Sequence, residues 1–327
     1  MSSPQGRIGV VIIGRNEGQR LVRCLQSIAE RASAWVYVDS GSTDGSVEAA
    51  RALGADVVEL DMHQPFTAAR ARNAGFARLQ EIGVVELVQF VDGDCEVSPG
   101  WLTTASEFLR TRPDVVVVAG RRRERFPDST IFNRLCDIEW DTPVGAAKAI
   151  GGDAMFRAES LQAAGGYRND LIAGEEPELC VRLRAAGGVV WRLDAEMTLH
   201  DAAITKWSQW WSRNVRSGHA FAEGARLHGG SPEGHFVSET RRAVVWALIL
   251  PLVILALCSI SGWGVLLLLA YPLQWLRLGA RLARQGSPIP WRYACFLLAA
   301  RFPEAQGVLR FWMGRLFGRR SAIIEYK

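Results

Sequence analysis

The chain has 327 residues, of which 49% are hydrophobic, and this length allows one large domain or two moderate ones. Residues 1–240 hold 26 Lys and Arg against 32 Asp and Glu, whereas residues 241–327 hold 12 against 2, so the two parts carry opposite net charge. The six cysteines form no Cys-x-x-Cys pair and no zinc-type spacing, which argues against a zinc site and favours reduced thiols in a cytoplasmic protein. Residues 1–7 are polar and lead directly into an apolar run, so we expect no signal peptide.

Apolar runs and helical patterns alternate four times between residues 8 and 91. Strands are expected at residues 8–14, 35–38, 56–60 and 87–91, with helices between them. This alternation predicts an α/β fold, with a Rossmann-like, mixed but mainly parallel sheet and helices on both faces. Ligands of such sheets bind beyond the carboxyl ends of the strands, and Asn16, Asp39 and Asp92 all follow strand ends. These residue types also form ordinary turns and helix N-caps, so each one alone is compatible with a structural role.

The most informative of these strand ends is Asp92-Gly93-Asp94, which directly follows the apolar run Val88–Val91. Two carboxylates at the edge of a sheet can hold a hard cation, and the cation can hold a diphosphate. No Gly-x-Gly-x-x-Gly follows the first expected strand, and no P-loop sequence occurs in the chain, so dinucleotide binding and P-loop chemistry are disfavoured.

Two further segments precede the middle of the chain. A valine-rich strand at residues 115–119 leads into Arg121–Arg123, which we expect to be a solvated strand end, with electrostatic guidance of an anionic substrate as the alternative. Gly151-Gly152-Asp153 is expected to bring the backbone close to a ligand, because paired glycines permit such an approach.

The segment Glu175–Leu179 opens a predicted helix with three carboxylates in four residues. Anions stabilise a helix N-terminus, so these acids have a structural explanation beside the hypothesis that one of them is a catalytic base. His200 follows a strand expected at residues 189–193 and is either structural or a metal ligand. In the helix after it, Arg213 and Arg216 share a face and form a cationic pair able to grip a diphosphate.

Residues 243–276 contain no charged residue, which is more than the ~20 apolar residues that a single membrane-spanning helix needs. Glycines and serines at residues 259–264 indicate a turn, so we predict a transmembrane hairpin of two short helices. Arginines flank both ends of this stretch, which places both ends in the cytoplasm by the positive-inside rule. Residues 308–317 then form a basic amphipathic helix typical of a membrane surface. The alternative, a buried core helix of a soluble domain, would not need such a length without a polar face.

Five short motifs occur in order between residues 8 and 220. Each alone is common, but together, at these intervals, they resemble the motif series of family-2 glycosyltransferases with a GT-A fold. The motifs are Val10–Glu17, Val38–Gly45, Ala71–Gly75, Asp92–Asp94 and Gly174–Leu179.

The resemblance implies that residues at the strand ends bind a nucleotide-diphosphate sugar. Asp39 would accept a hydrogen bond from the nucleotide base, and Asp92 would contact the ribose or a metal. The other residues expected near this donor are Gly14, Asn16, Glu17, Arg72, Asn73, Gly152 and Asp153.

The resemblance also implies a catalytic machinery. Asp94 would ligate Mg²⁺ or Mn²⁺, with Asp92 and His200 as further metal ligands. The general base would be Glu176, with Glu175 as the alternative, because most relatives have Asp at this position. Arg213 and Arg216 would steady the leaving group, as a later basic segment does in the family.

We therefore predict a metal-dependent inverting glycosyltransferase at the cytoplasmic face of the inner membrane. Its donor would be a nucleotide-diphosphate sugar, its acceptor a hydroxyl of a lipid-linked molecule or a polysaccharide precursor, and no nucleic-acid partner is expected. With one base and no obvious second nucleophile, direct displacement with inversion is the natural mechanism. The alternatives are a nucleotidyltransferase and a non-catalytic membrane scaffold. The expected parts are a catalytic domain at residues 1–235, the hairpin at 236–285 and the basic tail at 286–327.

Overall fold

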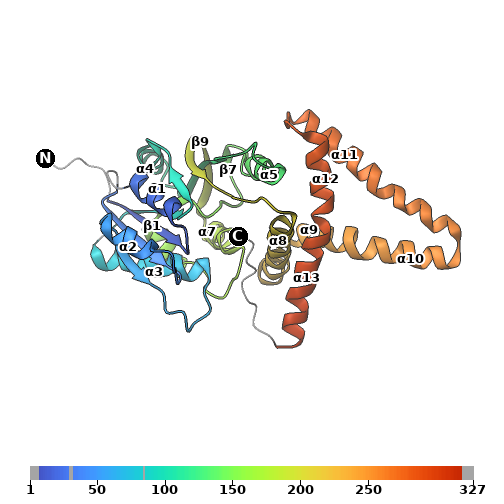
Figure 1. The fold of residues 1–327 in the computed structure, drawn as a ribbon, viewed down its shortest axis with the longest axis horizontal. Helices are drawn as coiled ribbons and strands as arrows, with labels where there is room; N and C mark the ends of the chain where they lie inside the picture. Colours follow the sequence, from blue (N-terminus) through green and yellow to red (C-terminus); the bar gives the residue numbers. More distant parts are fainter. Residues whose placement is uncertain (1–6, 29–31, 84, 319–327) are drawn as a thin grey trace. The chain divides into compact units, whose positions relative to one another are not determined.

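The computed structural model describes residues 7–28, 32–83 and 85–318. The chain divides into two compact units, residues 1–203 and 204–327, which we describe separately (Figure 1). The helix that carries Arg213 and Arg216 lies in the second unit, and the expected domain boundaries stay a prediction. Residues 319–327 of the expected tail lie outside the described residues.

A mixed sheet forms the centre of the first unit, in the order β3-β2-β1-β4-β8-β6-β9-β5, with β7 paired to β9 in the described part of the chain. The first four strands pair in parallel, whereas β8 runs antiparallel to both β4 and β6, so the predicted mixed α/β sheet is confirmed. The strands are β1 (Ile8–Gly14), β2 (Ala34–Asp39), β3 (Asp56–Glu59), β4 (Leu87–Asp92), β5 (Cys95–Val97), β6 (Val115–Glu124), β7 (Gly145–Ala146), β8 (Ala154–Arg157) and β9 (Val189–His200).

Helices pack against this sheet, and the boundary of one of them shows how local chemistry sets an element. Helix α3 begins at Ala68, because the Thr67 hydroxyl accepts a hydrogen bond from the Arg70 amide at 3.1 Å and caps the helix. Gly75 lets α3 pack closely on the sheet, since a Cβ at this position would lie 2.3 Å from a Val11 methyl group. The helices of this unit are α1 (Gln19–Ile28), α2 (Ser46–Ala52), α3 (Ala68–Ile82), α4 (Trp101–Thr111), α5 (Ile131–Glu139), α6 (Ala158–Ala163) and α7 (Glu175–Ala185).

The expectation that Arg121–Arg123 is a solvated strand end is wrong. Strand β6 continues through this run to Glu124, and the Arg122 side chain is 15% exposed, whereas that of Arg123 is 51% exposed. Arg121 and Arg122 are both largely buried and pair with carboxylates of this unit, and the register with β9 shifts between them, so the run does not follow the simple alternation of a strand. Strand β9 is also longer than expected and extends through His200.

The second unit is helical in its described residues, and α8 crosses α13 at two glycines. A Cβ at Gly218 would lie 1.9 Å from the Glu304 carbonyl oxygen, and one at Gly307 would lie 2.0 Å from the Val215 carbonyl oxygen. The two backbones therefore approach in a way that larger residues would prevent. The helices are α8 (Trp207–His228), α9 (Val237–Val244), η1 (Val245–Ile249), α10 (Leu250–Ile260), η2 (Gly262–Leu269), α11 (Ala270–Arg284), α12 (Pro290–Ala299) and α13 (Arg301–Leu316).

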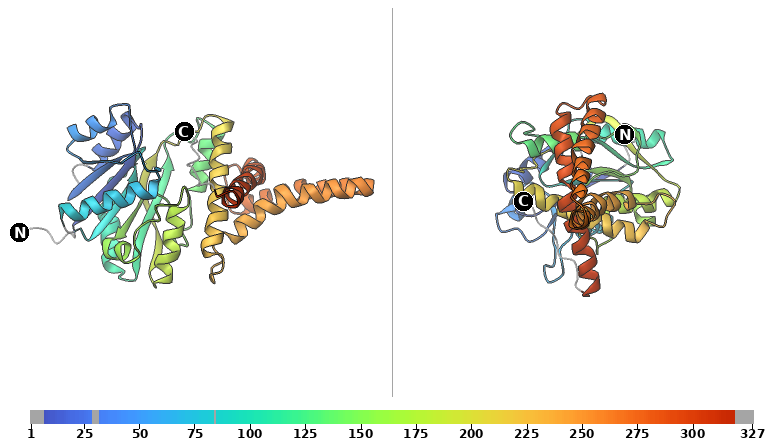
Figure 2. Two further views of the ribbon diagram at one scale, coloured as in Figure 1. Left: turned by 90° about the horizontal axis from the view of Figure 1, so that it is seen from below. Right: turned by 90° about the vertical axis from the view of Figure 1, so that its right-hand side faces the viewer.

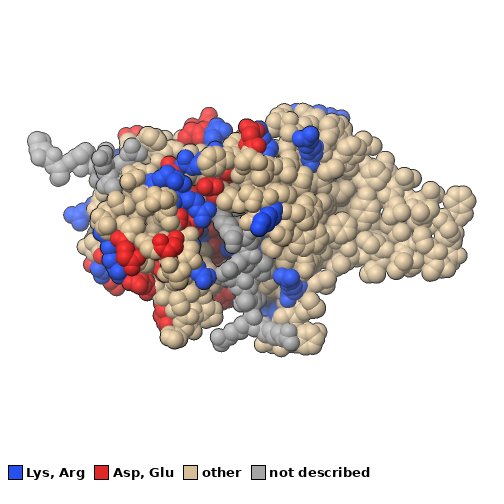
Figure 3. Space-filling view, viewed as in Figure 1, with Lys and Arg blue, Asp and Glu red and all other residues tan. Residues whose placement is uncertain are grey.

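An apolar helical hairpin extends from this second unit (Figure 2). Among the described residues, one continuous helix, Val237–Ile260, is long and apolar enough to cross a membrane, with a mean hydropathy of 2.8 in its most apolar window. The chain reverses at Ser261, as the glycines and serines predicted, and the returning arm contacts the first through the Tyr271 hydroxyl, which donates to the Trp246 carbonyl at 2.8 Å. In Figure 3 the far right end of the hairpin, where α10 turns back into η2, shows neither blue nor red atoms.

The expected amphipathic tail corresponds to the end of α13. Val308 and Phe311 are buried against neighbouring helices of the same unit, whereas Leu309, Trp312 and Leu316 are exposed. The helix starts at Arg301, earlier than the pattern predicted, and its buried side joins it to α8.

Candidate active site

The predicted strand ends meet at one edge of the sheet. Gly14 of β1 pairs with Asp39 of β2, and Ile13 pairs with Asp92 of β4, so the residues that follow these strands share one rim. The Asn16 side-chain oxygen accepts a hydrogen bond from the Thr43 amide at 2.8 Å, which ties the loop after β1 to the loop after β2. Parallel strands in register thus bring together the motifs that the sequence separates.

Asp39 shapes the loop that follows it. Its carboxylate accepts hydrogen bonds from the Tyr37 hydroxyl at 2.9 Å and from the Gly41 and Ser42 amides at 2.8 Å each. The residue is 2% exposed, so these three donors take the place of water, which cannot reach the buried carboxylate. Asp39 therefore holds the backbone of the loop in place, and its contact with a nucleotide base stays a prediction.

Asp92 lies in a group of carboxylates neutralised by two arginines. Its oxygens accept from the Arg72 guanidinium at 3.0 Å and from the Arg122 guanidinium at 2.9 Å. Arg122 also pairs with Asp153 at 3.1 Å, and Asp153 accepts from the Asp92 amide at 3.0 Å. Burial raises the pKa of Asp92, but the two guanidinium groups outweigh burial and leave that pKa below its ordinary value. We call Asp92, Asp153, Arg72 and Arg122 the arginine-paired group.

Gly152 lies against this group, and its approach to a ligand stays a prediction. A Cβ at this position would lie 2.5 Å from an Arg72 nitrogen and 3.0 Å from an Asp92 oxygen. The backbone before β8 therefore passes directly beside these charges, and a larger side chain would displace them.

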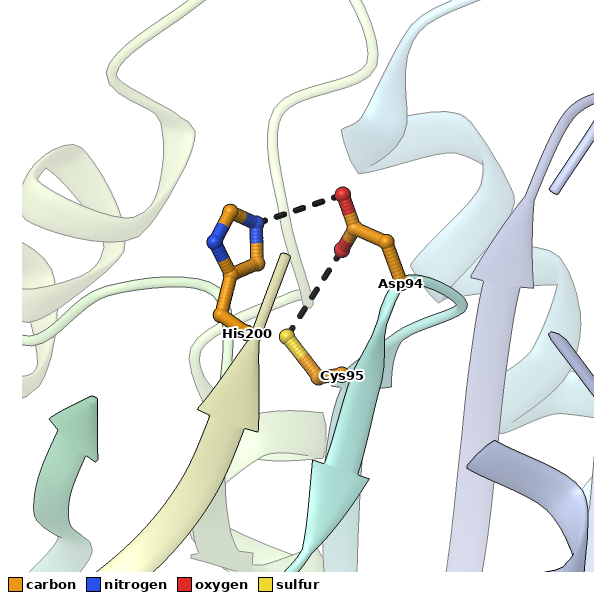
Figure 4. A group of neighbouring side chains, drawn as sticks. All are labelled: Asp94, Cys95 and His200. Carbon is orange, nitrogen blue, oxygen red and sulfur yellow. Dashed lines mark hydrogen bonds and ion pairs between the residues drawn. The ribbon is translucent and has the colours of Figure 1, made fainter. Parts of the chain in front are cut away.

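Asp94 belongs to a second group, with Cys95 and His200 (Figure 4). The His200 Nε2 atom lies 3.2 Å from one Asp94 oxygen, and the Cys95 thiol lies 3.6 Å from the other. All three residues are buried, and Cys95 is directly opposite His200 in the antiparallel pair of β5 and β9. On its other side, His200 Nδ1 lies 3.8 Å from a Glu124 oxygen. We call Asp94, Cys95 and His200 the histidine group.

The acidic start of α7 separates into carboxylates with different partners. Glu178 pairs with Arg182 one turn later at 2.7 Å, so its place in the helix is structural. Glu175 and Glu176 both contact Arg72, at 2.8 and 3.0 Å. Burial and the charge of Glu175 raise the pKa of Glu176 to about 7, although Arg72 opposes this shift. The Glu176 side chain is 15% exposed and that of Glu175 4%, so Glu176 is the more accessible acid.

The arrangement matches known proteins. Residues 9–145 match the model of glycosyl transferase family 2. These residues form a family-2 glycosyltransferase domain.

Solved structures show the same GT-A fold. A mannosyltransferase from Pyrobaculum calidifontis, solved with GDP-Man and Mn²⁺, is 21% identical, with a TM-score of 0.66 over 94% of this chain and 88% of that chain. Glucosyl-3-phosphoglycerate synthase from Mycobacterium tuberculosis, solved with Mn²⁺, UDP and glucosyl-3-phosphoglycerate, is 18% identical, with a TM-score of 0.50 over 66% of this chain and 78% of that chain. TarS from S. aureus is 15% identical, with a TM-score of 0.52 over 92% of this chain and 55% of that chain.

Two other residues that were predicted to bind the donor form contacts with residues of the first unit. The Asn73 amide donates to the Tyr167 carbonyl and to the Asn169 side chain at 2.7 Å each, and so fixes the loop after α6. Glu17 pairs with Arg20 at 2.7 Å in the first turn of α1. Their contacts with a nucleotide sugar stay predictions. Arg213 and Arg216 lie half-buried on α8 of the second unit, and their role toward the leaving group also stays a prediction.

Sequence reasoning missed several residues of this site, namely Cys95, Glu124 and the inward side chain of Arg122. Glu124 accepts from the Asn133 side chain at 3.1 Å and from the Ala202 amide at 3.0 Å, which holds it beside His200. A strand extended through Arg121–Arg123 would have indicated that part of this run faces inward. Cys95 carries no signal of its own, because its place depends on the register between β5 and β9.

Proposed function

We propose that this protein is a metal-dependent inverting glycosyltransferase that moves a sugar from a nucleotide-diphosphate donor to a hydroxyl acceptor. The observation that carries the proposal is a set of contacts that joins the acidic start of α7 to the end of β4. Arg72 pairs with both Glu176 and Asp92, and the histidine group begins at Asp94, two residues after Asp92. The site therefore combines a place for a cation with an accessible carboxylate of raised pKa.

The histidine group fits a divalent cation. Carboxylate oxygen and imidazole nitrogen are ligands that Mn²⁺ accepts, and Asp94 with His200 supplies both within 3.2 Å. Glu124, near the other ring nitrogen, would orient the imidazole, as acidic partners of metal-binding histidines do. A bound Mg²⁺ or Mn²⁺ would neutralise the charge that develops on the diphosphate leaving group. The neighbouring structures solved with Mn²⁺ support this assignment.

Glu176 is the proposed general base. A carboxylate accepts the proton of an attacking hydroxyl most effectively when its pKa lies near the working pH, and burial with Glu175 raises the pKa of Glu176 to about 7. Arg72 holds Glu176 at 3.0 Å and Asp92 at 3.0 Å, so it fixes the base relative to the strand end. With Glu176 as the one proposed base and no residue assigned as a second nucleophile, we propose direct displacement with inversion.

A screen of nucleotide sugars tests this function. The full-length protein, purified in detergent with Mn²⁺, should release a nucleoside diphosphate from at least one donor, and Glu176→Gln should lower the rate by about 10²–10⁴-fold. Ser160→Ala on α6 is the control and should keep the parent rate. Release of inorganic diphosphate from a nucleoside triphosphate would show a nucleotidyltransferase instead. A protein that turns over no donor would leave the scaffold alternative.

The proposed location is the cytoplasmic face of the inner membrane, with a lipid-linked or polysaccharide-precursor acceptor. The hairpin exposes large apolar side chains such as Leu252, Leu255 and Trp263, and arginines stand at both of its ends. By the positive-inside rule, both ends then lie on the cytoplasmic side. An apolar surface of this kind is stable in a bilayer and would be costly in water.

Flotation with liposomes that contain anionic lipid tests the location. Leu252→Arg with Leu255→Arg should release the protein from the floating fraction, because each arginine costs about 2.5–3.5 kcal/mol at the centre of a membrane helix. Met62→Arg, at an exposed position of the first unit, is the matched control and should float like the parent. Equal flotation of all three proteins would contradict insertion of the hairpin.

A further inference from the structure

We propose that the Cys95 thiolate is a third protein ligand of the cation held by Asp94 and His200, so that this site prefers metals that accept sulfur over Mg²⁺. The inference rests on the proposed function, because it assigns a ligand to the proposed metal site. It adds a donor of a different chemical type to the carboxylate and the imidazole.

The sheet itself brings the three donors together. Cys95 and His200 are directly opposite each other in the antiparallel pair of β5 and β9, and Asp94 precedes Cys95. Opposite residues of such a pair place their Cβ atoms about 4.5–5.5 Å apart on one face of the sheet. The position of the sulfur is therefore set by backbone register rather than by a flexible loop.

The distances between donors are close to the edges of a coordination polyhedron. With metal–sulfur and metal–nitrogen bonds of ~2.3 and ~2.0 Å, the donors of a tetrahedral site lie ~3.3–3.7 Å apart. One Asp94 oxygen lies 3.2 Å from the His200 nitrogen and the other lies 3.6 Å from the Cys95 sulfur, and one ligand atom from each of the three residues lies within 4.8 Å of the others. Small side-chain rotations would suffice to close the site around an ion.

Cys95 also lies within reach of Asp92 and Asp153, but a positively charged side chain, Arg122, already pairs with both of these carboxylates. The Arg122 guanidinium pairs with Asp92 at 2.9 Å and with Asp153 at 3.1 Å. It also lies 3.0 Å from the Cys95 sulfur, so the sulfur contacts both groups. Arg122 thus neutralises the two carboxylates of the arginine-paired group and leaves Asp94 and His200 as the partners of Cys95 at a metal.

Charge accounting favours the same arrangement. Each of the two carboxylates in the arginine-paired group already contacts a guanidinium group, and Arg72 also pairs with Glu175 and Glu176. In the histidine group, the Asp94 carboxylate and a Cys95 thiolate would cancel a divalent cation, with a neutral His200. On metal binding the S–H bond breaks, the metal–sulfur bond forms and the proton passes to the solvent, without any change of oxidation state.

A sulfur ligand changes which metals the site selects. Thiolate and imidazole suit Zn²⁺ and similar borderline ions, whereas Mg²⁺ prefers oxygen ligands alone. Mn²⁺ is expected to bind, Zn²⁺ and Co²⁺ to bind more tightly than Mn²⁺, and Mg²⁺ to compete weakly.

Spectroscopy with Co²⁺ tests the proposal independently of activity. The full-length protein would first carry Cys258→Ser and Cys295→Ser, because these two exposed thiols could bind the metal adventitiously. Titration with Co²⁺ should then produce a sulfur-to-cobalt charge-transfer band in the near ultraviolet. Cys95→Ser should abolish the band while the protein remains folded, and Cys180→Ser, which alters a buried thiol outside both groups, should leave it unchanged.

The outcomes are distinguishable. A band that persists in Cys95→Ser, or calorimetric Co²⁺ binding without any band in the parent, would overturn sulfur ligation, and the carboxylate and imidazole of the proposed function would then hold the metal alone. If Co²⁺ does not bind, the inference fails, and a sugar-transfer assay with Mn²⁺ shows separately whether the proposed function fails with it. Cys95→Ala, tested in the same way, separates loss of the sulfur from any effect of the serine hydroxyl.

Discussion

Asp92 and Asp94 are separated by one glycine, yet the fold gives them opposite electrostatic surroundings. Arg72 and Arg122 bind the Asp92 carboxylate, whereas Asp94 faces the His200 imidazole and the Cys95 thiol. The Asp92 carboxylate is thus neutralised by arginine side chains of the protein, whereas the Asp94 carboxylate lies beside side chains that can bind a metal.

The difference teaches that a pair of acids in a sequence does not specify a shared role. Strand β4 ends at Asp92 and β5 begins at Cys95, so the chain turns between the two acids and directs their side chains to different partners. We infer that an added cation goes to Asp94, and that Asp92 instead links the strand end to the arginines around the base.

The largest expected effect separates the two acids by activity. Asp94→Asn should lower sugar transfer by at least about 10³-fold, because the leaving diphosphate would lose the charge stabilisation of the metal. The measurement is the rate of nucleoside diphosphate release at saturating Mn²⁺. Thermal unfolding of the same variant is the control and should change little. A variant within tenfold of the parent rate would show that the two acids are not specialised as described.

The next effect concerns stability. Asp92→Asn should destabilise the first unit by about 1–3 kcal/mol, because it removes a charged acceptor shared by two buried guanidinium groups. Urea unfolding followed by tryptophan fluorescence measures this change. Asp61→Asn, at an exposed loop position, is the matched control and should stay within about 0.5 kcal/mol of the parent. A neutral Asp92→Asn would mean that Glu175, Glu176 and Asp153 satisfy the arginines without it.

A third effect tests how the charge of Glu175 influences the proposed base, Glu176. The charge of Glu175 helps to raise the pKa of Glu176, so Glu175→Gln should lower that pKa. Since the base must be deprotonated, activity of the parent should rise as the pH increases through about 7, and the variant should reach its plateau at lower pH. The pH profile of kcat/KM measures the shift. A profile that moves to higher pH would contradict the assignment of Glu176 as the base.

The smallest effect concerns Gly152. Gly152→Ala should lower the rate of transfer by severalfold, because the new Cβ would displace Arg72 and Asp92 by a fraction of an ångström. Gly151→Ala is the matched control, since a Cβ there meets no atom within 4 Å. Equal rates for the two variants would show that the arginine-paired group tolerates displacement.

The strand ends and the order of motifs could be predicted from the sequence, because hydrophobic periodicity fixes parallel strands and places Asn16, Asp39 and Asp92 at one rim. The helical hairpin and its turn near Ser261 were also predictable, since they depend on local composition. The partners of Asp92 were not, because Arg122 reaches it from β6 across the sheet. Likewise, the pairing of Cys95 with His200 depends on a register set by residues far apart in the chain.

Calorimetric titration of Mn²⁺ tests the central claim most directly, with Asp94→Asn and Asp92→Asn compared with the parent protein. We predict that Asp94→Asn lowers the affinity for Mn²⁺ by at least about 100-fold and that Asp92→Asn changes it by less than about fivefold, because the guanidinium groups rather than the metal neutralise Asp92. An equal loss in both variants, or a larger loss in Asp92→Asn, would contradict the division of the two acids into a metal ligand and an arginine partner.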